Sequence, residues 1–175
     1  MKSTGIIRRI DDLGRIVIPK EIRRTLRIHE GDPMELYVQD GGVLFKKYSP
    51  IGDMSDFSQN FADALFESTG HIALICDMDN IVAVAGTSKK NFLNKPIWNL
   101  ALKATEERQT QICSSKNGQE DFDYQTQVVT PVICEGDVIG AIGLISKDTV
   151  GITEQKLIEM TAIFLAKQME QWTTH

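Results

Sequence analysis

Residues 2–26 read KSTGIIRRIDDLGRIVIPKEIRRTL, and this stretch predicts two strands followed by a helix. Residues 4–10 and 15–18 are rich in β-branched side chains, which favour strands. The four residues between them, Asp11 to Gly14, have the composition of a turn, and Gly14 can adopt a positive φ. Pro19 ends the second strand and suits the first position of a helix that we expect to run to about residue 28.

The helix expected after Pro19 carries its cations on one side. At roughly 100° per residue, Lys20, Arg23, Arg24 and Arg27 fall within an arc of about 100°, beside an apolar pair. Like charges at this spacing oppose helix formation by roughly a few tenths of a kcal/mol per pair. Such a surface is typical of a site that binds a polyanion, and a solvated helix face is the alternative interpretation of the helix alone.

The predicted turn is flanked by three more cations, Arg8, Arg9 and Arg15. The planar guanidinium of arginine can form two hydrogen bonds at once with phosphate oxygens or with a guanine edge. The pattern therefore indicates double-stranded DNA as the partner. Asp11 and Asp12 lie in the same turn, where they either hold the arginines in position or point to solvent, and the sequence leaves both open.

The charge of the chain is divided between a basic head and an acidic body. Residues 1–50 carry 10 Lys and Arg against 7 Asp and Glu, net +3, whereas residues 51–175 carry 9 against 17, net −8. This division indicates two domains with different partners. Residues 34–38 and 43–48 predict two further strands in the head. A head of this size, apolar on both faces of its strands, makes a poor core alone, so we expect it to fold as a homodimer.

The head resembles a known family. The stretches 2–19, 21–26 and 44–48 are similar to the N-terminal domain of AbrB-type transition-state regulators, over nearly all of residues 1–50. The resemblance implies a swapped-hairpin β-barrel, in which two chains interleave their strands into an intertwined dimer that binds DNA. Similar swapped-hairpin heads also occur in antitoxins that neutralise toxins, and an antitoxin-like autoregulator is therefore an alternative function.

The resemblance also implies which side chains contact DNA. It assigns arginines at the positions of Arg8, Arg15, Arg23 and Arg24, and a basic residue at Arg9. The helical arc alone adds two more. The predicted DNA-binding residues are Arg8, Arg9, Arg15, Lys20, Arg23, Arg24 and Arg27.

The body, residues 56–175, is expected to follow a linker at 51–55. Phe57, Phe61 and Leu65 recur at helical spacing in a first helix. A last helix is expected to begin with Thr153 as its N-cap and to be apolar over a wide face from Leu157 to Trp172. We expect these helices to pack against a second chain, which together with the dimer of heads would give a homotetramer. The alternative is that both helices cover one sheet of the same chain. Strands are expected at 72–76, 81–85, 125–134 and 138–146, a mostly helical segment at 91–107 and a polar loop at 114–123.

The order of these elements, with the strand–turn–strand segment at 131–142, resembles a GAF domain. The predicted fold class is therefore α+β: an AbrB-like swapped-hairpin β-barrel followed by a GAF-like α/β sandwich with an antiparallel sheet. Gly136, Gly140 and Gly143 lack the spacing of a dinucleotide-binding loop, and we interpret them as turn and close-packing glycines.

We expect no cofactor, no metal ion and no catalytic residue. The three histidines are scattered, and Cys76, Cys113 and Cys134 form no C-x-x-C pair. We therefore predict that the chain is not an enzyme. The alternative is a thiol reductase, because some GAF domains reduce free methionine sulfoxide with cysteines. GAF domains can also hold small ligands, but the sequence shows no ligand signature, so a ligand and its binding residues stay unknown.

An AbrB-type head joined to a GAF-like body resembles a family of regulators of late sporulation genes in endospore-forming bacteria. This resemblance implies a sequence-selective transcription regulator that acts in the forespore, activates some promoters and represses others. The body would serve oligomerisation and could sense a signal. The sequence has no apolar run of membrane-spanning length and no signal peptide, so we expect a cytoplasmic protein with no membrane partner.

Overall fold

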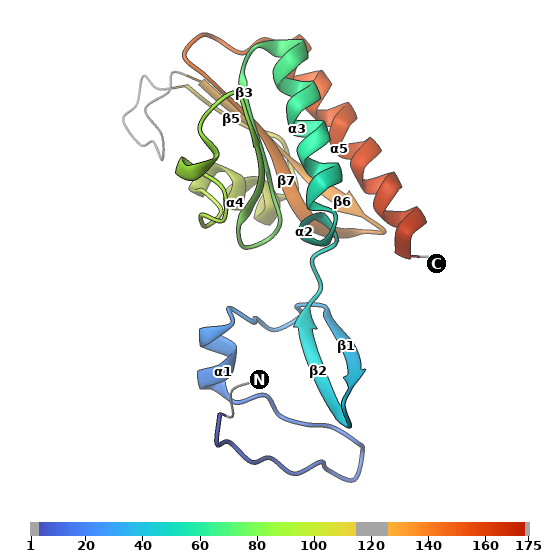
Figure 1. Ribbon diagram of the computed structural model, residues 1–175. Coiled ribbons are helices and arrows are strands. Elements are labelled where there is room, and N and C mark those ends of the chain that lie inside the picture. Colours follow the sequence, from blue (N-terminus) through green and yellow to red (C-terminus); the bar gives the residue numbers. More distant parts are fainter. Residues whose placement is uncertain (1–3, 115–125, 174–175) are drawn as a thin grey trace. The chain divides into compact units, whose positions relative to one another are not determined.

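The computed structural model describes residues 4–114 and 126–173, and for residues 172 and 173 it describes the backbone alone. The chain divides into two compact units, Met1–Tyr48 and Ser49–His175, and each is described by itself (Figure 1). The polar loop predicted at 114–123 lies, after Ser114, outside the described residues, as does the side chain of Trp172. Within the described ranges, no helix combines the length and the apolar character needed to cross a membrane.

The first unit contains helix α1 (Lys20–Thr25) and an antiparallel pair of strands, β1 (Met34–Gln39) and β2 (Gly42–Lys47). The turn between the strands places Asp40 at φ 50° and Gly41 at φ 73°, as a two-residue type I′ hairpin turn requires. The two strands predicted for the end of the head are therefore confirmed.

The strands predicted at 4–10 and 15–18 are absent from the single chain, since the structure has no strand between residues 4 and 19. The turn itself is present: Gly14 has φ 76°, and its N–H donates to the carbonyl oxygen of Asp11 at 3.0 Å. A strand is stabilised by backbone hydrogen bonds to a neighbour, and β1 and β2 pair with each other instead. No residue from 4 to 48 is buried, so one chain gives the head no core.

The second unit is built on a five-stranded antiparallel sheet in the order β4-β3-β7-β6-β5. Its strands are β3 (Ile72–Cys76), β4 (Ile81–Ala85), β5 (Gln111–Ser114), β6 (Thr126–Cys134) and β7 (Asp137–Ser146). Its helical segments are α2 (Pro50–Asp53), α3 (Ser55–Thr69), the 3-10 turn η1 (Lys89–Asn91), α4 (Asn99–Glu107) and α5 (Ile152–Thr173). Figure 1 shows α3 and α5 side by side over one face of the sheet and α4 over the other.

Both faces of the sheet are buried, which explains why its strands read as continuous apolar runs. Val128 of β6 packs with Leu65 of α3 and Leu165 of α5, whereas the next residue, Val129, packs with Trp98 on the side of α4. Successive residues of a strand point to opposite faces, so β6 contributes to both cores. The four predicted body strands and the first long helix lie where the sequence predicts them. Helix α5 already begins at Ile152, so the prediction that Thr153 is its N-cap is wrong. The segment 91–107, predicted to be mostly helical, is α-helical only over α4, and β5 was not predicted.

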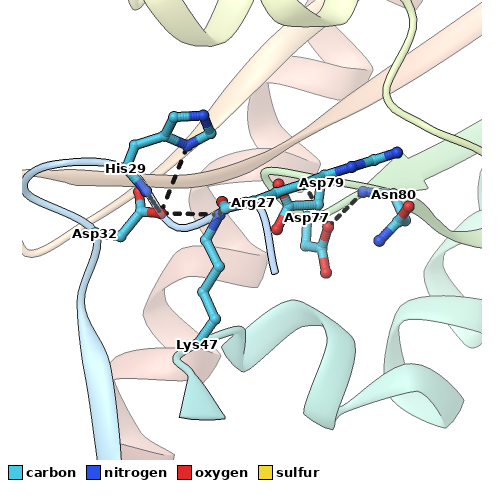
Figure 2. Close-up of polar contacts among 7 residues, drawn as sticks. All are labelled: Arg27, His29, Asp32, Lys47, Asp77, Asp79 and Asn80. Carbon is cyan, nitrogen blue, oxygen red and sulfur yellow. Dashed lines mark hydrogen bonds and ion pairs between the residues drawn. The ribbon is translucent and has the colours of Figure 1, made fainter. Parts of the chain in front are cut away.

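The segment predicted as a linker, residues 51–55, is helical and belongs to the second unit: it lies in α2 and the start of α3, and Ile51 is fully buried. The hydroxyl of Ser49 accepts the N–H of Gly52 at 3.3 Å and donates to Oδ2 of Asp77 at 2.8 Å. The other carboxylate oxygen of Asp77 accepts the N–H of Asn80 at 2.7 Å (Figure 2). The sequence analysis missed this capping and burial, because Pro50, Gly52 and the polar residues around them are typical of a linker.

The outer edge of β4 is covered by a side chain. Gln59 donates from Nε2 to the carbonyl oxygen of Val84 at 2.9 Å, and its Oε1 accepts the N–H of Val84 at 3.4 Å. The amide of Gln59 thereby occupies backbone groups that would otherwise offer an edge for pairing with another chain.

Replacing Gln59 by leucine is expected to lower the free energy of unfolding of the second unit by about 1–3 kcal/mol, because both Val84 groups lose their partner. Urea unfolding followed by tryptophan fluorescence measures this, since both Trp98 and Trp172 belong to the second unit. Asp63→Leu is the control, because it removes only the exposed 2.8 Å bond to the same amide. Equal losses in the two variants would contradict the edge-covering role.

A polar network joins α5 to the sheet. Oγ1 of Thr110 donates to Oε1 of Glu159 at 3.2 Å and lies 2.9 Å from Oγ1 of Thr130, which leaves Thr130 as the donor between the two hydroxyls. Lys156 and Gln155 donate to the same carboxylate at 2.7 and 2.9 Å. The bonds from Lys156 and Gln155 hold the pKa of Glu159 below its usual value, against the smaller effect of burial.

Replacing Glu159 by glutamine is expected to destabilise the second unit at neutral pH and progressively less in acid. Because the folded-state pKa is lowered, the contribution of the carboxylate is complete above the unfolded-state value, near 4.5, and is lost as the pH falls through the folded-state value. Unfolding free energies of both proteins between about pH 3 and 7 measure the difference. A difference that does not change with pH, or an equal effect of Glu106→Gln on exposed α4 surface, would argue against this assignment.

Candidate nucleic-acid interface

Asp11 organises the turn that carries Arg15. Its Oδ1 accepts the backbone N–H of Leu13 at 3.0 Å and that of Arg15 at 2.8 Å, and its Oδ2 accepts Nε–H of Arg15 at 2.7 Å. The backbone N–H and the guanidinium of Arg15 hold the pKa of Asp11 below its usual value, so the carboxyl is ionised at neutral pH. Of the two roles that the sequence left open for Asp11, the structure shows the holding of an arginine.

Helix α1 presents its cations to solvent. It follows Pro19, whose φ of −58° suits a helix start, so the predicted start is confirmed to within one residue. Lys20 lies in its first turn, and Arg23 and Arg24 lie in its last turn, where cations also interact favourably with the helix dipole. None of its residues is buried, so packing within one chain contributes little to its stability.

The helix ends at Thr25 rather than near residue 28, and this removes Arg27 from its cationic arc. The N–H of Ile28 donates to the carbonyl oxygen of Arg23 at 2.8 Å, and that of Arg27 to Arg24 at 3.4 Å, which is a Schellman termination. Arg27 has φ 52°, the left-handed conformation that ends a helix in this motif. The prediction that Arg27 continues the arc is wrong, because the backbone leaves the helical path before reaching it.

A second polar cluster fixes the loop after α1 to β2 (Figure 2). Lys47 donates from Nζ to Oδ2 of Asp32 at 3.1 Å and to the carbonyl oxygen of Arg27 at 3.2 Å, while the N–H of His29 donates to the same carboxylate at 2.8 Å. Burial opposes the ionisation of Asp32, but the bonds from His29 and Lys47 outweigh it and lower its pKa. The sequence analysis missed this cluster, because residues so far apart along the chain carry no local signal.

All seven predicted DNA-binding side chains are exposed. Six of them form two groups: the turn group, Arg8, Arg9 and Arg15, and the helix group, Lys20, Arg23 and Arg24. Within residues 4–48, the structure shows no hydrogen bond or ion pair between a side chain of the turn group and one of the helix group. One chain therefore displays both groups without fixing the turn against the helix.

Two cysteines of the body lie in environments that suppress thiol reactivity. Cys76 is fully buried, and burial raises the pKa of its thiol to about 12. Burial, with the nearby carboxylates of Glu170 and Glu135, also raises the pKa of Cys134. Reactive thiols need a lowered pKa, so neither residue supports the reductase alternative. Over the described part of the chain, no group of three or more His, Cys, Asp or Glu is placed to hold a metal ion.

Comparison with known families gives two matches along the chain. The family described as stage V sporulation protein T C-terminal, transcription factor, matches residues 53–170. The family described as antidote-toxin recognition MazE, bacterial antitoxin, matches residues 7–53. The two matches together cover the head and most of the body.

Individual proteins resemble the chain over the same regions. Stage V sporulation protein T of Bacillus subtilis (strain 168) is 51% identical over 98% of this chain and 100% of that protein. The transition state regulatory protein AbrB of the same organism is 53% identical over 32% of this chain and 65% of that protein. The solved GAF domain from Acinetobacter phosphoenolpyruvate-protein phosphotransferase has a TM-score of 0.59 at 11% identity, over 69% of this chain and 84% of that chain. The predicted combination of an AbrB-like head and a GAF-like body is thus confirmed.

Proposed function

The chain belongs to the family of stage V sporulation protein T transcription factors, and on that basis we propose that it is a DNA-binding regulator of sporulation genes. In this proposal two heads pair and bind a duplex through the turn group and the helix group. The exposure of all six cations, on a head that lacks a core of its own, is the observation that carries this proposal. It accounts for both the charge and the incompleteness of the head.

The head needs a second copy to form a core. Its apolar side chains are in solvent in the single chain: Ile7 is 86% exposed, Val17 73% and Val38 85%. Burial of such residues contributes about 1.5–3 kcal/mol each, so an isolated head forgoes most of its stabilisation. Pairing residues 4–18 of two chains would bury side chains of this segment, such as Ile7 and Val17, and would give its backbone hydrogen-bond partners. This supports the intertwined swapped-hairpin dimer implied by the AbrB resemblance.

Pairing also doubles the cationic surface. A two-fold dimer presents two turn groups and two helix groups to a duplex whose own pseudo-symmetry matches. We assign the DNA contacts to Arg8, Arg9, Arg15, Lys20, Arg23 and Arg24, mostly to phosphates, with sequence preference partly from DNA shape. Arg27 drops from this set, because the arc that suggested it ends at Thr25.

Binding of the intact chain to a promoter-length duplex across a salt series tests this function. If the cations neutralise phosphates, the logarithm of affinity should fall linearly with the logarithm of salt concentration, by about 0.9 for each phosphate contacted. A random duplex should bind more weakly than the promoter at every salt concentration. Absence of binding at low salt, with the dimer intact by light scattering, would overturn the proposal.

The body supports assembly beyond the dimer. Helices α3 and α5 both cover the same face of the sheet, yet α5 keeps a row of apolar side chains in solvent: Met160 is 61% exposed, Ile163 60% and Phe164 51%. The ring of Phe164 lies 5.8 Å from that of the half-buried Phe61 of α3, so the exposed row borders α3. We propose that this α3–α5 face pairs with a second body, which would link two head dimers in a tetramer and raise their avidity for DNA.

Phe164→Glu is expected to convert the tetramer to dimers, because it places a charge in the centre of the α3–α5 face. Size-exclusion chromatography with light scattering measures the mass at several concentrations. Leu102→Glu is the matched control, since Leu102 is 40% exposed on α4, over the opposite face of the sheet. A tetramer that survives Phe164→Glu, or that Leu102→Glu breaks equally, would place the interface elsewhere.

We propose further that the protein acts on late sporulation genes in the forespore, activating some promoters and repressing others. Promoter–reporter fusions in forespores with and without the gene measure the sign at each promoter. The match of residues 7–53 to an antitoxin family favours one other candidate, an antitoxin-like autoregulator. A cognate toxin neutralised by the intact chain would support that candidate. The packed sheet and helices of residues 49–114 and 126–173 argue against it, because antitoxins usually wrap the toxin with a disordered tail.

A further inference from the structure

Asp11 is an acidic residue in the turn that carries Arg15, one of the residues that we assign to DNA binding. Its carboxylate is fully engaged: Oδ1 accepts two backbone N–H groups of the turn, and Oδ2 accepts Nε–H of Arg15 at 2.7 Å. Arg15 is otherwise open to solvent, with 69% of its side chain exposed. The ion pair is local, between residues four apart, and both residues belong to the same turn.

The bond to Asp11 decides which edge of the guanidinium remains for a ligand. A guanidinium offers five N–H donors, and the Nε–H is now occupied. The terminal Nη1 and Nη2 groups keep their donors, and this edge can bind a phosphate or a guanine with two parallel hydrogen bonds. Holding the long side chain in one conformation before binding also reduces the rotamer entropy lost on contact.

We propose that Asp11 is a positioning residue for DNA recognition, which orients Arg15 so that the outer edge of its guanidinium meets the duplex. This inference rests on the proposed function. In this role Asp11 contributes through Arg15 and contacts no DNA atom itself. The contribution of Arg15 to selectivity for the preferred sequence depends on the orientation of its guanidinium. Its contribution to the general attraction for a polyanion depends only on its charge.

The two possible roles of Asp11 predict opposite changes in DNA affinity when its charge is removed. Removing a negative charge beside a phosphate backbone should strengthen binding if Asp11 acts only through its charge. Removing the orientation of Arg15 should weaken it. The neighbouring Asp12 separates the two effects, because it is exposed in the same turn and the structure shows no hydrogen bond or ion pair of its side chain with any described residue.

The test compares Asp11→Asn with Asp12→Asn in the intact chain. The asparagine at position 11 keeps an oxygen for the two backbone N–H groups, so the turn is retained while the charged partner of Arg15 is lost. The probes are a duplex selected by the unmodified protein from a random pool and a scrambled duplex of the same length. We expect Asp11→Asn to weaken binding of the selected duplex by about tenfold and to lower its advantage over the scrambled one. Asp12→Asn is expected to leave binding unchanged or to tighten it.

A double substitution shows whether Asp11 acts through Arg15. In an Arg15→Ala background, Asp11→Asn should cause no further loss, because the group that Asp11 orients is gone. An additional loss of binding in that background would overturn the inference. So would a fall in the melting temperature of the head dimer large enough to account for the whole loss of binding, because the role of Asp11 would then be merely structural.

Arg15→Lys provides a second route that leaves Asp11 intact. Lysine keeps the charge but has neither the Nε–H that Asp11 holds nor a planar fork, so it should lose selectivity while the salt dependence stays nearly unchanged. If Arg15→Ala weakens binding but Asp11→Asn behaves as Asp12→Asn does, or Arg15→Lys retains full selectivity, the inference fails and the DNA-binding function stands. If the unmodified protein selects no duplex from the random pool, the proposed function itself fails.

Discussion

Replacing Arg23 by alanine is expected to weaken binding to the preferred duplex by about 2–4 kcal/mol, a loss of ~30- to 1000-fold. The reason is symmetry: the proposed head dimer carries two copies of Arg23, whose side chain lies exposed in the last turn of α1. The plot of affinity against salt concentration should also become shallower, by about 2 in logarithmic slope, because two phosphate contacts disappear. Fluorescence anisotropy of a labelled duplex across a salt series measures both quantities.

The control for Arg23→Ala removes the same charge from the body. Lys103 is exposed on α4, within 3.9 Å of Glu107, and Lys103→Ala changes the net charge by the same amount. It should leave both the affinity and the salt slope close to those of the unmodified protein. Equal effects of the two substitutions would mean that DNA responds to total charge, and the assignment of the helix group would then be untenable.

Adding one methyl group at position 140 is expected to be the most damaging small change in the body. A Cβ on Gly140 would collide with the carbonyl oxygen of Cys76 and lie 2.9 Å from Cδ1 of Ile51 and 3.0 Å from Cα of Asp77. Two of these three atoms belong to backbone, which cannot rotate away, so β3 and β7 would have to separate. We expect Gly140→Ala to lower the free energy of unfolding by roughly 3–5 kcal/mol, a large part of a typical domain's stability.

Urea unfolding followed by tryptophan fluorescence measures this loss, and Gly151→Ala is its control. At Gly151 the nearest atom to a new Cβ is Oε2 of Glu154 at 3.0 Å, the mobile end of a flexible side chain. The control should therefore change stability by no more than about 1 kcal/mol. A Gly140→Ala protein as stable as Gly151→Ala would show that the β3–β7 contact is softer than its geometry implies.

The features that the sequence predicted correctly are those that short-range chemistry dictates. Gly136 has φ 90° in the β6–β7 turn, and Gly140 and Gly143 lie where a Cβ would collide, as close-packing glycines should. Pro19 precedes α1, and the alternation around Asp40 and Gly41 gives a hairpin. Each of these depends on the conformational preference of one residue or on a pattern of a few neighbours.

The features that the sequence could not supply depend on partners that are distant along the chain or that a single chain does not provide. Residues 4–18 have strand composition, but a strand forms only when its backbone finds a neighbour, and one chain offers none. The helical periodicity of the sequence predicted that Arg27 lies in the helix. The helix instead ends before Arg27, with a hydrogen bond from the N–H of Ile28 to the carbonyl oxygen of Arg23. Lys47 reaches Asp32 across the fold, and no local pattern reports a contact of that kind.

The absence of any buried residue between 4 and 48 has a consequence for gene dosage. In the proposed dimer the interior of the head is completed by a second chain, so the head assembles by a bimolecular step. At low abundance the amount of paired head then rises with the square of the chain concentration. Slow synthesis then yields almost no dimeric regulator, whereas rapid synthesis yields a disproportionate amount. Dimerisation as proposed would therefore convert a gradual rise in expression into a threshold, with no effector needed.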